Sequence, residues 1–490
     1  MRGKIRRALV VTTLLVFATG AVSAPAAAEQ GPVAHFVVLG VEGKPLDRVV
    51  AAVVAAGGRV SRSWPQIGVV VATSPDAAFA AAVRGRPGVV AAGNTRNLAE
   101  LDEGATTARR AESTPVAHVG EEPLDQYQWA LRQIGGDRAH EITDGNRDVL
   151  VGVLDSRIHA DNPDLAPNID ETASVSCAGG VPNTSRAAWT APPDATFAHA
   201  TAVAGVIAAA RNGVGIAGVA PNVRIAAVAL SDNGYVFPEE MICGYVWAAE
   251  HGVDVTNASF SVDPWVRWCD DDPDQAAAAA AMMRAIDYAA DHDVVNVAAS
   301  GNANWDLSHP VLDTYSPVNG EPVERLTGHG CRQLPTEAPD VLIVSGVGAD
   351  KLKAQYSNYG IRDVDLTAPS GDGNQIPDVP GGNPGVITPV NLGEWGFFGG
   401  TSAAAPHAVG VVALLRGTHP DWSAQRVIAA VQRDADRLPC PPGGVFDPDG
   451  TGEWLAHCEG GRSGKGFYGS GLVDALAAVA TGDPGRDGTG

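Results

Sequence analysis

Three polar residues stand beside long apolar runs, where the chemistry of a serine hydrolase could be assembled. Asp155 ends one apolar run, His199 begins a second, and Ser402 precedes a third in a glycine-rich turn. A carboxylate can orient a histidine, and that histidine can accept a proton from a serine. A serine at a helix start lies where unpaired backbone N–H groups favour an oxyanion. Each residue alone is also typical of a cap, core or surface position, so the combination carries the prediction.

Asn302 adds a fourth group to this set. It follows the apolar run 294–299 and lies between His199 and Ser402 in the chain. An asparagine amide can donate a hydrogen bond to a developing oxyanion. The other interpretation is a turn-forming asparagine after Gly301.

Alternating strand and helix patterns predict the elements that position these groups. Five apolar runs are typical of strands covered on both faces: 149–154, 224–230, 253–258, 294–299 and 341–347. Helical patterns lie between or after them: 200–210, 238–251, 273–291, 403–416 and 423–433. The alternation predicts an α/β fold, a three-layer domain with a mostly parallel central sheet. Sites in such sheets gather at the carboxyl ends of the strands.

A smaller unit precedes this domain. Residues 33–94 show the order strand, helix, strand, strand, helix, strand, with the second helix expected over 74–84. This pattern predicts a small α+β domain of about the smallest size that folds alone. Residues 100–123 are rich in acidic, Thr, Ala and Gly residues and are predicted to be an exposed linker.

Several stretches resemble the subtilisin-like serine peptidases, whose residues follow the same order of Asp, His and Ser. The principal matches are Val-Leu-Asp155-Ser, His199-x-Thr-x-Val-Ala-Gly205, Ala-Ser-Gly-Asn302 and Gly400-Thr-Ser402-x-Ala-Ala-Pro406. Lesser matches lie at 127–131, 212–220, 356–360 and 469–475. Together they extend from about residue 120 to 477. The small unit also resembles the inhibitory propeptide that precedes such enzymes.

The resemblance implies a role for each matched residue. His199 takes the proton from Ser402, Asp155 orients the histidine, and Asn302 with the Ser402 N–H binds the oxyanion. An acyl-enzyme then forms and is released by water. Substrate-binding residues carried over by the resemblance follow two strands: Ser259, Phe260, Ser261, Ala299, Ser300 and Gly301. The expected partners are a protein or peptide substrate and the chain's own propeptide as an intramolecular inhibitor.

Three positions depart from the family pattern and put the efficiency of the site in doubt. Arg157 replaces a glycine, and would strain its loop if that position needs a positive φ. Ala200 replaces another glycine and could crowd the histidine. Ser261 replaces a third and could narrow the peptide groove. The alternatives are therefore a catalytically impaired peptide-binding pseudoprotease and a secreted esterase.

The first 28 residues are typical of an export signal. Four basic residues precede the apolar segment 8–21, and Ala-rich residues 26–28 offer a cleavage site, with 22–24 as the alternative. The predicted organisation is therefore a signal peptide (1–28), a propeptide domain (30–100), a linker with the maturation site (101–123), a catalytic domain (124–477) and a flexible tail (478–490). The predicted location is secreted, extracellular.

Six cysteines in an exported chain indicate disulfides rather than a metal site. Six thiols allow 15 pairings. Cys440–Cys458 is preferred because it closes a short Pro/Gly-rich loop, Cys269–Cys331 is a weaker expectation, and Cys177–Cys243 follows by subtraction.

Charge and motif content narrow the remaining partners. The net charge of −22 argues against nucleic acid and anionic membranes as partners, and a monomer without stable membrane association is expected. The glycines of 213–218 follow a helix instead of a strand, which excludes a dinucleotide site. The acidic turn 447–453 has too few ligands for a calcium loop. No cofactor is expected for the chemistry; a structural calcium ion, as in related enzymes, stays unassigned, and His407 is expected to be structural.

Overall fold

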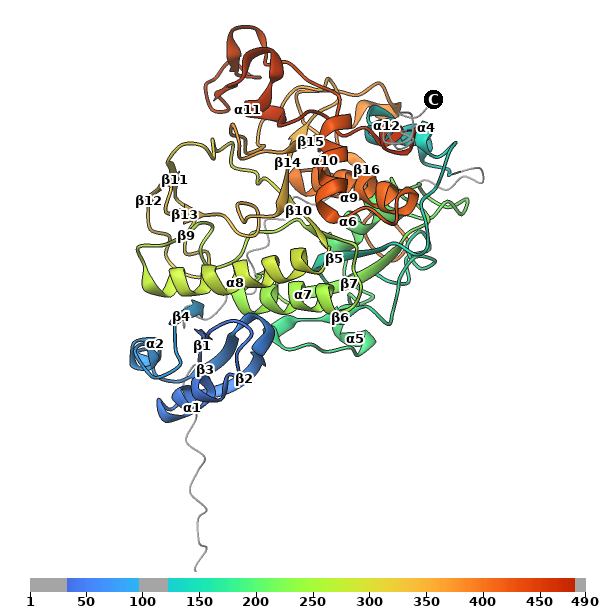
Figure 1. Cartoon of the computed structure of the whole chain (residues 1–490). Helices are drawn as coiled ribbons and strands as arrows, with labels where there is room; N and C mark the ends of the chain where they lie inside the picture. Colours follow the sequence, from blue (N-terminus) through green and yellow to red (C-terminus); the bar gives the residue numbers. More distant parts are fainter. Residues whose placement is uncertain (1–32, 97–121, 481–490) are drawn as a thin grey trace, which may run out of the picture.

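The computed structural model describes residues 33–96 and 122–480. The predicted signal peptide, most of the predicted linker and the last ten residues of the tail lie outside these ranges. The described chain forms a small N-terminal unit, coloured blue in Figure 1, and a large α/β domain.

A seven-stranded sheet forms the centre of the large domain. Its strands are β5 (Leu150–Ser156), β6 (Val175–Ser176), β7 (Arg224–Ser231), β8 (Val255–Ala258), β10 (Val295–Ala299), β14 (Val341–Val347) and β15 (Leu366–Pro369). The order is β15-β14-β10-β8-β5-β7-β6, and every pairing is parallel. The predicted parallel sheet is confirmed, and its two edge strands, β6 and β15, are additions to the prediction.

Helices cover both faces of this sheet (Figure 1). One face carries α6 (His199–Ala208), α9 (Thr401–Thr418), α10 (Ala424–Asp434) and α12 (Ala475–Ala480), and the other carries α7 (Pro238–Glu250) and α8 (Pro273–Asp291). Side chains alternate between the two cores: Val151 and Val153 face the first set, whereas Leu150 and Leu154 face the second. This alternation explains why apolar residues occupy consecutive positions along the strands.

The strand order changes direction beside β5. From β5 the chain builds β6 and β7 on one side, then returns to place β8 on the other. Such a reversal leaves a crevice at the carboxyl ends of the strands. Asp155 lies at that end of β5, so the fold puts it where a ligand can approach.

The small unit is a four-stranded antiparallel sheet with two helices. Its elements are β1 (Ala34–Leu39), α1 (Asp47–Ala55), β2 (Arg59–Trp64), β3 (Val69–Ser74), α2 (Phe79–Val83) and β4 (Ala91–Arg96). The predicted element order is confirmed, but the expected start of the second helix is wrong. Ser74 precedes a proline and stays in β3, and the Asp76 carboxylate accepts the Ala78 N–H, which holds a turn there.

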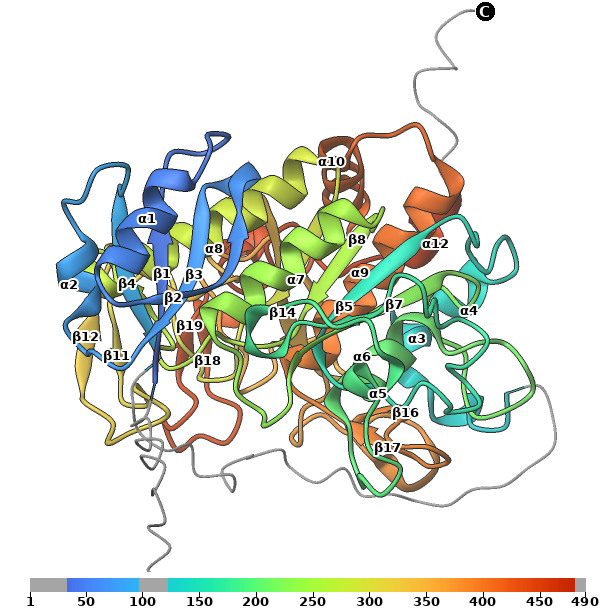
Figure 2. The ribbon, with the colours of Figure 1, turned by 90° about the horizontal axis from the view of Figure 1, so that it is seen from below.

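One face of the small sheet packs against α7 and α8 (Figures 1 and 2). Val37, Leu39 and Val69 of the sheet share a core with Met282 and Ala285 of the large domain. The opposite face is covered by α1 and α2. The sheet is therefore buried on both sides, although its two covers come from different parts of the chain.

Short elements complete the large domain. The helices are α3 (Trp129–Gln133), α4 (Gly136–Ala139), α5 (Arg186–Trp189) and α11 (Lys465–Tyr468). The paired strands are β9 (Trp268–Cys269) with β13 (Cys331–Arg332), β11 (Val311–Asp313) with β12 (Arg325–Thr327), β16 (Val386–Pro389) with β17 (Trp395–Phe398), and β18 (Val445–Phe446) with β19 (Ala456–His457). Three disulfides join the cysteines in the expected pairs: Cys177–Cys243, Cys269–Cys331 and Cys440–Cys458.

Candidate active site

A carboxylate and an imidazole meet at the crevice. Asp155 ends the buried part of β5 and is only 4% exposed, and His199 is the first residue of α6. His199 Nδ1 lies 2.8 Å from Oδ2 and 2.9 Å from Oδ1 of Asp155. Because the carboxylate only accepts, the proton is assigned to Nδ1, and Nε2 is left as a base. The Ser156 N–H donates to Asp155 Oδ1 at 2.7 Å and holds the carboxylate in place.

The Asp155 charge determines how His199 titrates. Burial lowers the pKa of His199, but the charge of Asp155 and the hydrogen bond outweigh it and leave that pKa above the ordinary histidine value. The ring of Phe398 meets the imidazole edge-on, with 5.3 Å between centroids. The imidazole is thus held by a carboxylate and an aromatic ring.

The nucleophile turn depends on a glycine. Gly400 has a φ of +94°, and an added Cβ would lie 3.3 Å from Asn302 Nδ2. Ser402 follows in the first turn of α9, where helical N–H groups lack partners. Its Oγ donates to the carbonyl oxygen of Ser259 at 3.3 Å rather than to His199. Such contacts of a nucleophile are often loose until substrate binds.

Asn302 is held so that its amide nitrogen is left for a ligand. Its Oδ1 accepts the N–H of Thr401 at 2.8 Å and the Thr401 hydroxyl at 3.0 Å. The Gly301 N–H donates to the same hydroxyl at 3.1 Å. Thr401 therefore ties the loop after β10 to the nucleophile turn. It stands inside the matched Gly-Thr-Ser stretch, but the sequence analysis gave it no role.

Tyr356 is a second site residue that the sequence analysis did not select. Its hydroxyl accepts the Gly400 N–H at 3.0 Å. The same hydroxyl lies 2.5 Å from the carbonyl oxygen of Gly371 and 2.9 Å from that of Ser370, so it can donate its proton there. It fixes the Gly399–Gly400 peptide of the nucleophile turn, and its only sequence signal was membership of the matched stretch 356–360.

A cleft opens beside the imidazole, Asn302 and the turn that precedes Ser402. His199, Asn302 and Gly400 are among the residues that line a cleft of about 700 Å³. This volume lies within the range of about 300–1,000 Å³ typical of ligand sites. Residues that are far apart in the chain are therefore brought together around one cavity. We predicted such a gathering at the carboxyl ends of the strands.

The residues predicted to bind substrate fall into two groups. Ser259, Phe260 and Ser261 follow β8 and stand at the carboxyl edge of the sheet. In the neighbouring segment, the Ala299 carbonyl accepts from Thr336 at 2.9 Å, and Ser300 has its N–H, carbonyl and hydroxyl all bonded inside the protein. Residues 299–301 can therefore offer a packed wall, but Ser300 has no polar group free for a peptide.

The departures from the family pattern are accommodated. Arg157 lies outside the left-handed region, so the expected strain is absent. Its guanidinium pairs with Asp232 at 2.7 Å. Ala200 is buried, and its N–H donates to the Ser156 hydroxyl at 3.2 Å, so a side chain fits there. Ser261 likewise has no positive φ.

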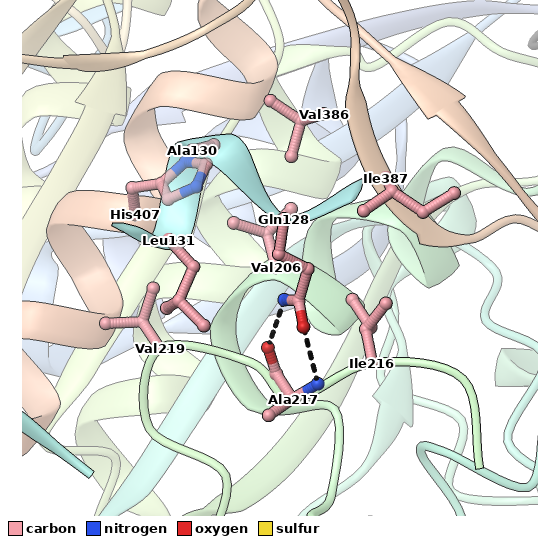
Figure 3. Close-up of a pocket in the computed structure, with 10 residues that line it drawn as sticks. All are labelled: Gln128, Ala130, Leu131, Val206, Ile216, Ala217, Val219, Val386, Ile387 and His407. Carbon is pink, nitrogen blue, oxygen red and sulfur yellow. Dashed lines mark hydrogen bonds between the residues drawn. The ribbon is translucent and has the colours of Figure 1, made fainter. Parts of the chain in front are cut away.

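A second cavity lies inside the fold and holds no catalytic group (Figure 3). Its volume is about 10 Å³, roughly the space of one water. The Gln128 amide pairs with both the N–H and the carbonyl of Ala217 on its wall. His407 also lines it, with Nδ1 donating to the Ala403 carbonyl at 2.7 Å. Burial lowers the pKa of His407 to about 4, so this histidine stays neutral and fits the structural interpretation.

The last strand of the small unit, β4, runs along the carboxyl edge of the seven-stranded sheet in the large domain, where the catalytic groups lie. Gly93 lies against the start of α8, where an added Cβ would meet the Asp274 carbonyl oxygen at 2.3 Å. Arg96 then pairs with Glu239 at the start of α7 and stacks on Phe237 at 4.2 Å. The starts of α7 and α8 lie at the carboxyl edge, because both helices follow strands of a parallel sheet. The chain leaves β4 at this edge.

Two carboxylates near one loop fit a structural cation. Asp164 is fully buried; its Oδ2 accepts from Trp395 at 2.7 Å and from the Ile216 N–H at 3.1 Å, while Oδ1 has no protein partner. Glu122 accepts the Gly213 N–H, and its Oε2 is also unpartnered. Burial, with a contribution from the Glu122 charge, raises the pKa of Asp164 to about 7. Free carboxylate oxygens of this kind suit calcium.

Other acidic groups do not form a metal centre. Within residues 33–96 and 122–480, no three His, Cys, Asp or Glu side chains converge on a point that could hold a metal ion. In the turn 447–453, Asp447 and Asp449 accept backbone N–H groups of their own turn. None of the helices described is both long and apolar enough to cross a bilayer.

Comparison with known proteins identifies relatives of this architecture. The sequence profile of the Subtilase family matches residues 146–452. The chain is 26% identical over 365 residues to Subtilisin NAT of Bacillus subtilis subsp. natto, covering 74% of each chain. It is 26% identical over 326 residues to Fervidolysin of Fervidobacterium pennivorans, covering 63% of this chain and 40% of that protein. The chain thus spans less than half of Fervidolysin.

Solved structures share the fold. The epidermin leader peptide processing serine protease of Staphylococcus aureus, solved as a serine-to-alanine mutant, superposes with a TM-score of 0.69 and 18% identity, covering 92% of this chain and 100% of that one. Fervidolysin, described as a keratinolytic enzyme related to subtilisin, gives a TM-score of 0.61 and 23% identity, covering 92% of this chain and 61% of that one. At these identities the likeness concerns the fold.

Proposed function

Because the chain belongs to the subtilase family of subtilisin-like serine endopeptidases, we propose that it is a secreted endopeptidase made as a self-processing zymogen. The observation that carries the proposal is the bond between His199 Nδ1 and Asp155, in a cleft that also contains Asn302 and the nucleophile turn. This set of groups matches the needs of acyl transfer. Substrates are proteins or peptides.

The proposed mechanism assigns one task to each group. His199 Nε2 takes the Ser402 proton as Oγ attacks the peptide carbonyl carbon, and Asp155 stabilises the imidazolium that forms. The Asn302 amide and the Ser402 N–H receive the negative charge on the carbonyl oxygen. The C–N bond breaks as His199 gives the proton to the leaving amine, and water then releases the acyl group from Ser402 by the same route.

These steps are assigned to side chains and backbone groups alone. Proton transfer belongs to His199, and oxyanion charge is met by hydrogen-bond donors. The place where residues fit a structural calcium ion is the pair Asp164 and Glu122, whose other oxygens hold the loop 213–216. A cation there would offset the repulsion between two buried carboxylates and stabilise that loop.

The small unit is proposed to be an inhibitory propeptide. Its sheet covers α7 and α8, and β4 ends at the catalytic edge of the large domain. The fold match covering 92% of this chain extends beyond residues 122–480, so it includes the small unit. Cleavage within the predicted linker, residues 101–123, would release the mature enzyme. We place the mature enzyme outside the cell, as a monomer.

Comparison of the secreted wild-type protein with Ser402→Ala tests this function. Mass spectrometry of the wild type should give an N-terminus within residues 101–123, whereas Ser402→Ala should keep the small unit covalently attached. If the wild type and Ser402→Ala had the same processed N-terminus, another protease would be removing the small unit. Absence of protein hydrolysis by the processed wild type would contradict the proposed activity itself.

A peptide-binding pseudoprotease is the second candidate. The departures at Arg157, Ala200 and Ser261 were its basis in the sequence. Arg157 and Ser261 have no positive φ, and Ala200 is buried with its N–H bonded to Ser156, whereas narrowing of the peptide groove by Ser261 stays a prediction. The geometry of Asp155 and His199 favours the active enzyme. A secreted esterase has no structural observation in its favour.

A further inference from the structure

The large cleft extends to one side of the catalytic groups. Its walls include His199, Asn302 and Gly400, but neither residues 259–261 nor residues 299–301 contribute to them. Those two segments follow the neighbouring strands β8 and β10, whose ends pair Ala258 with Ala298. The cleft therefore lies on the side of the nucleophile turn away from the two segments predicted to bind substrate.

The side on which the cleft lies fixes which part of a substrate can fill it. In peptide hydrolysis the leaving amine takes its proton from the histidine, so the chain after the scissile bond lies on the histidine side. His199 lines the cleft, and the oxyanion donor Asn302 stands at its boundary. We name this cavity the leaving-group pocket, defined by the 700 Å³ cleft.

Aromatic side chains dominate the leaving-group pocket. Phe197, Tyr356, Phe397, Phe398 and Trp454 line it, although they come from four separate segments of the chain. Aromatic pairs contribute beyond their buried area when their rings can meet edge-on or offset. A cavity of this size with several rings can therefore bind one large apolar side chain.

The charged residues around the leaving-group pocket also favour an apolar substrate side chain over an acidic one. Its one acidic lining residue is Asp372, and no Lys or Arg contributes to its walls. The Asp372 carboxylate accepts the N–H of Gln355 at 2.7 Å and that of Asn374 at 2.8 Å. An acidic substrate side chain would meet no cation there and would face a carboxylate.

Trp454 is delivered to the pocket by a braced loop. It lies between β18 and β19, in the segment closed by the Cys440–Cys458 disulfide. The Leu455 carbonyl accepts from Asn304 Nδ2 at 3.3 Å, which ties the loop to the chain just after Asn302. The loop is therefore anchored on both sides of the tryptophan.

We propose that the leaving-group pocket selects substrates with a bulky aromatic or apolar side chain just after the scissile bond. The inference rests on the proposed function, because it assigns a preference to the same catalytic site. It identifies Trp454 and Phe397 as specificity-determining residues.

Acyl transfer measures this preference separately from the acyl side. An activated ester first acylates Ser402 of the processed protein. An added amino-acid amide then competes with water: its nitrogen attacks the acyl carbon, the bond to Ser402 Oγ breaks, and the proton returns to Oγ through His199. Phenylalaninamide, glycinamide and the α-amide of aspartate are compared as acceptors, and the ratio of peptide product to acid is measured.

The wild type should transfer to phenylalaninamide about tenfold more efficiently than to glycinamide, and least to the aspartate amide. Trp454→Ala and, independently, Phe397→Ala should bring the phenylalanine-to-glycine ratio close to one. Leu455→Ala is the matched control, because this exposed neighbour does not line the pocket, and its ratio should equal that of the wild type.

The two possible failures are distinguishable. Absence of any ester turnover would contradict the proposed function. Ester turnover with equal transfer to all three amides would overturn the inference. So would a phenylalanine-to-glycine ratio that neither Trp454→Ala nor Phe397→Ala changes. Neither result would contradict the proposed endopeptidase activity.

Discussion

The catalytic cleft and the docking face of the small unit lie along the same edge of one sheet, yet they are built differently. The cleft uses single polar groups at the ends of β5, α6, β10 and α9, each held by one to three hydrogen bonds. The docking face joins an apolar side of a sheet to α7 and α8 and adds Arg96 with Glu239 at its rim. The cleft depends on the direction of individual hydrogen bonds, whereas the docking face depends mainly on the apolar area that it buries.

That difference predicts how each region responds to change. Burial of apolar area is additive and non-directional, so loss of one apolar side chain leaves much of the docking face intact. Catalysis needs groups placed within a few tenths of an ångström, so loss of one hydrogen bond in the cleft has a large effect. The buried charges of the docking face are the exception, because they resemble the cleft in needing defined partners.

The largest expected effect is that of Asp155→Asn. It should lower kcat by about 10⁴-fold, because the amide stabilises the wrong histidine tautomer and no longer balances the imidazolium. The carboxylate also keeps the pKa of His199 above its ordinary value, and the base must be neutral. The acid limb of kcat/KM in the wild type should therefore lie above about pH 6.5 and move to lower pH in the variant. An unchanged acid limb would contradict this assignment.

Substitution at the docking face should rank second. Glu239→Gln removes the nearer of the two buried carboxylates that pair with Arg96, while Glu240 still lies 3.5 Å away. The loss should be at most about 3–5 kcal/mol, the cost of breaking a buried ion pair outright. Gln66→Ala removes the exposed bond to Glu250 and should cost less than about 1 kcal/mol. Both substitutions are made in full-length Ser402→Ala protein, and the loss of docking stability is measured by hydrogen–deuterium exchange of β4. Equal protection of β4 in the two variants would mean that apolar area alone holds the small unit.

The same docking pair should respond to acid. Burial raises the pKa of Glu239, but the charges of Arg96 and His35 outweigh it and hold that pKa below the usual range. The docked state then binds fewer protons than the separated one, so this contribution is complete above the ordinary carboxylate pKa and is lost as pH falls through the lowered value. Exchange of β4 should increase in strong acid, and Glu239→Gln should remove that dependence.

Asn302 should show a smaller effect, confined to catalysis. Asn302→Ala should lower kcat by about 10²–10³-fold with little change in KM, because the amide acts on the oxyanion. Asn302→Asp is the matched variant: it keeps an oxygen for the Thr401 N–H but loses the donor. If Asn302→Asp retained wild-type kcat, Asn302 would serve only to position the nucleophile turn.

The smallest expected effect concerns the proposed cation at Asp164. Calcium should raise the Tm of the wild type by about 2–4 °C, the shift that corresponds to roughly 1 kcal/mol. Asp164→Asn should abolish the calcium-dependent rise. Asp447→Asn, in the exposed acidic turn, should retain it. A calcium response that is equal in all three proteins would contradict the assignment.

The elements were predictable where the physical signal is local. Buried parallel strands such as Val341–Val347 are mostly apolar, with Ser345 the one polar side chain of that strand, and α8 begins at a proline after an aspartate that caps it. The short strands β9, β13 and β18 carry too few residues for a periodic pattern. They are held by cross-strand pairing, whose register a single sequence does not reveal, although the disulfides beside them were predicted.

The site residues also divide into those marked by a local sequence pattern and those that depend on contacts elsewhere in the fold. Asp155, His199, Asn302 and Ser402 stood in recognisable stretches; the structure pairs Asp155 with His199 and places His199 and Asn302 on one cleft beside the turn that precedes Ser402. Tyr356 acts through hydrogen bonds to Ser370, Gly371 and Gly400, and Trp454 through the shape of a cavity. No local pattern assigns these roles. The bonded backbone of Ser300 was equally invisible, since it depends on Asn358.

The most direct test of the account is whether Ser402 is an activated nucleophile. Processed wild-type protein is treated with a serine-selective organophosphonate probe, and the labelled peptides are mapped by mass spectrometry. The account predicts a single adduct on Ser402, strongly reduced in Asp155→Asn because the base is impaired. Processed, folded protein that carries no adduct on Ser402 would contradict it and leave the peptide-binding pseudoprotease.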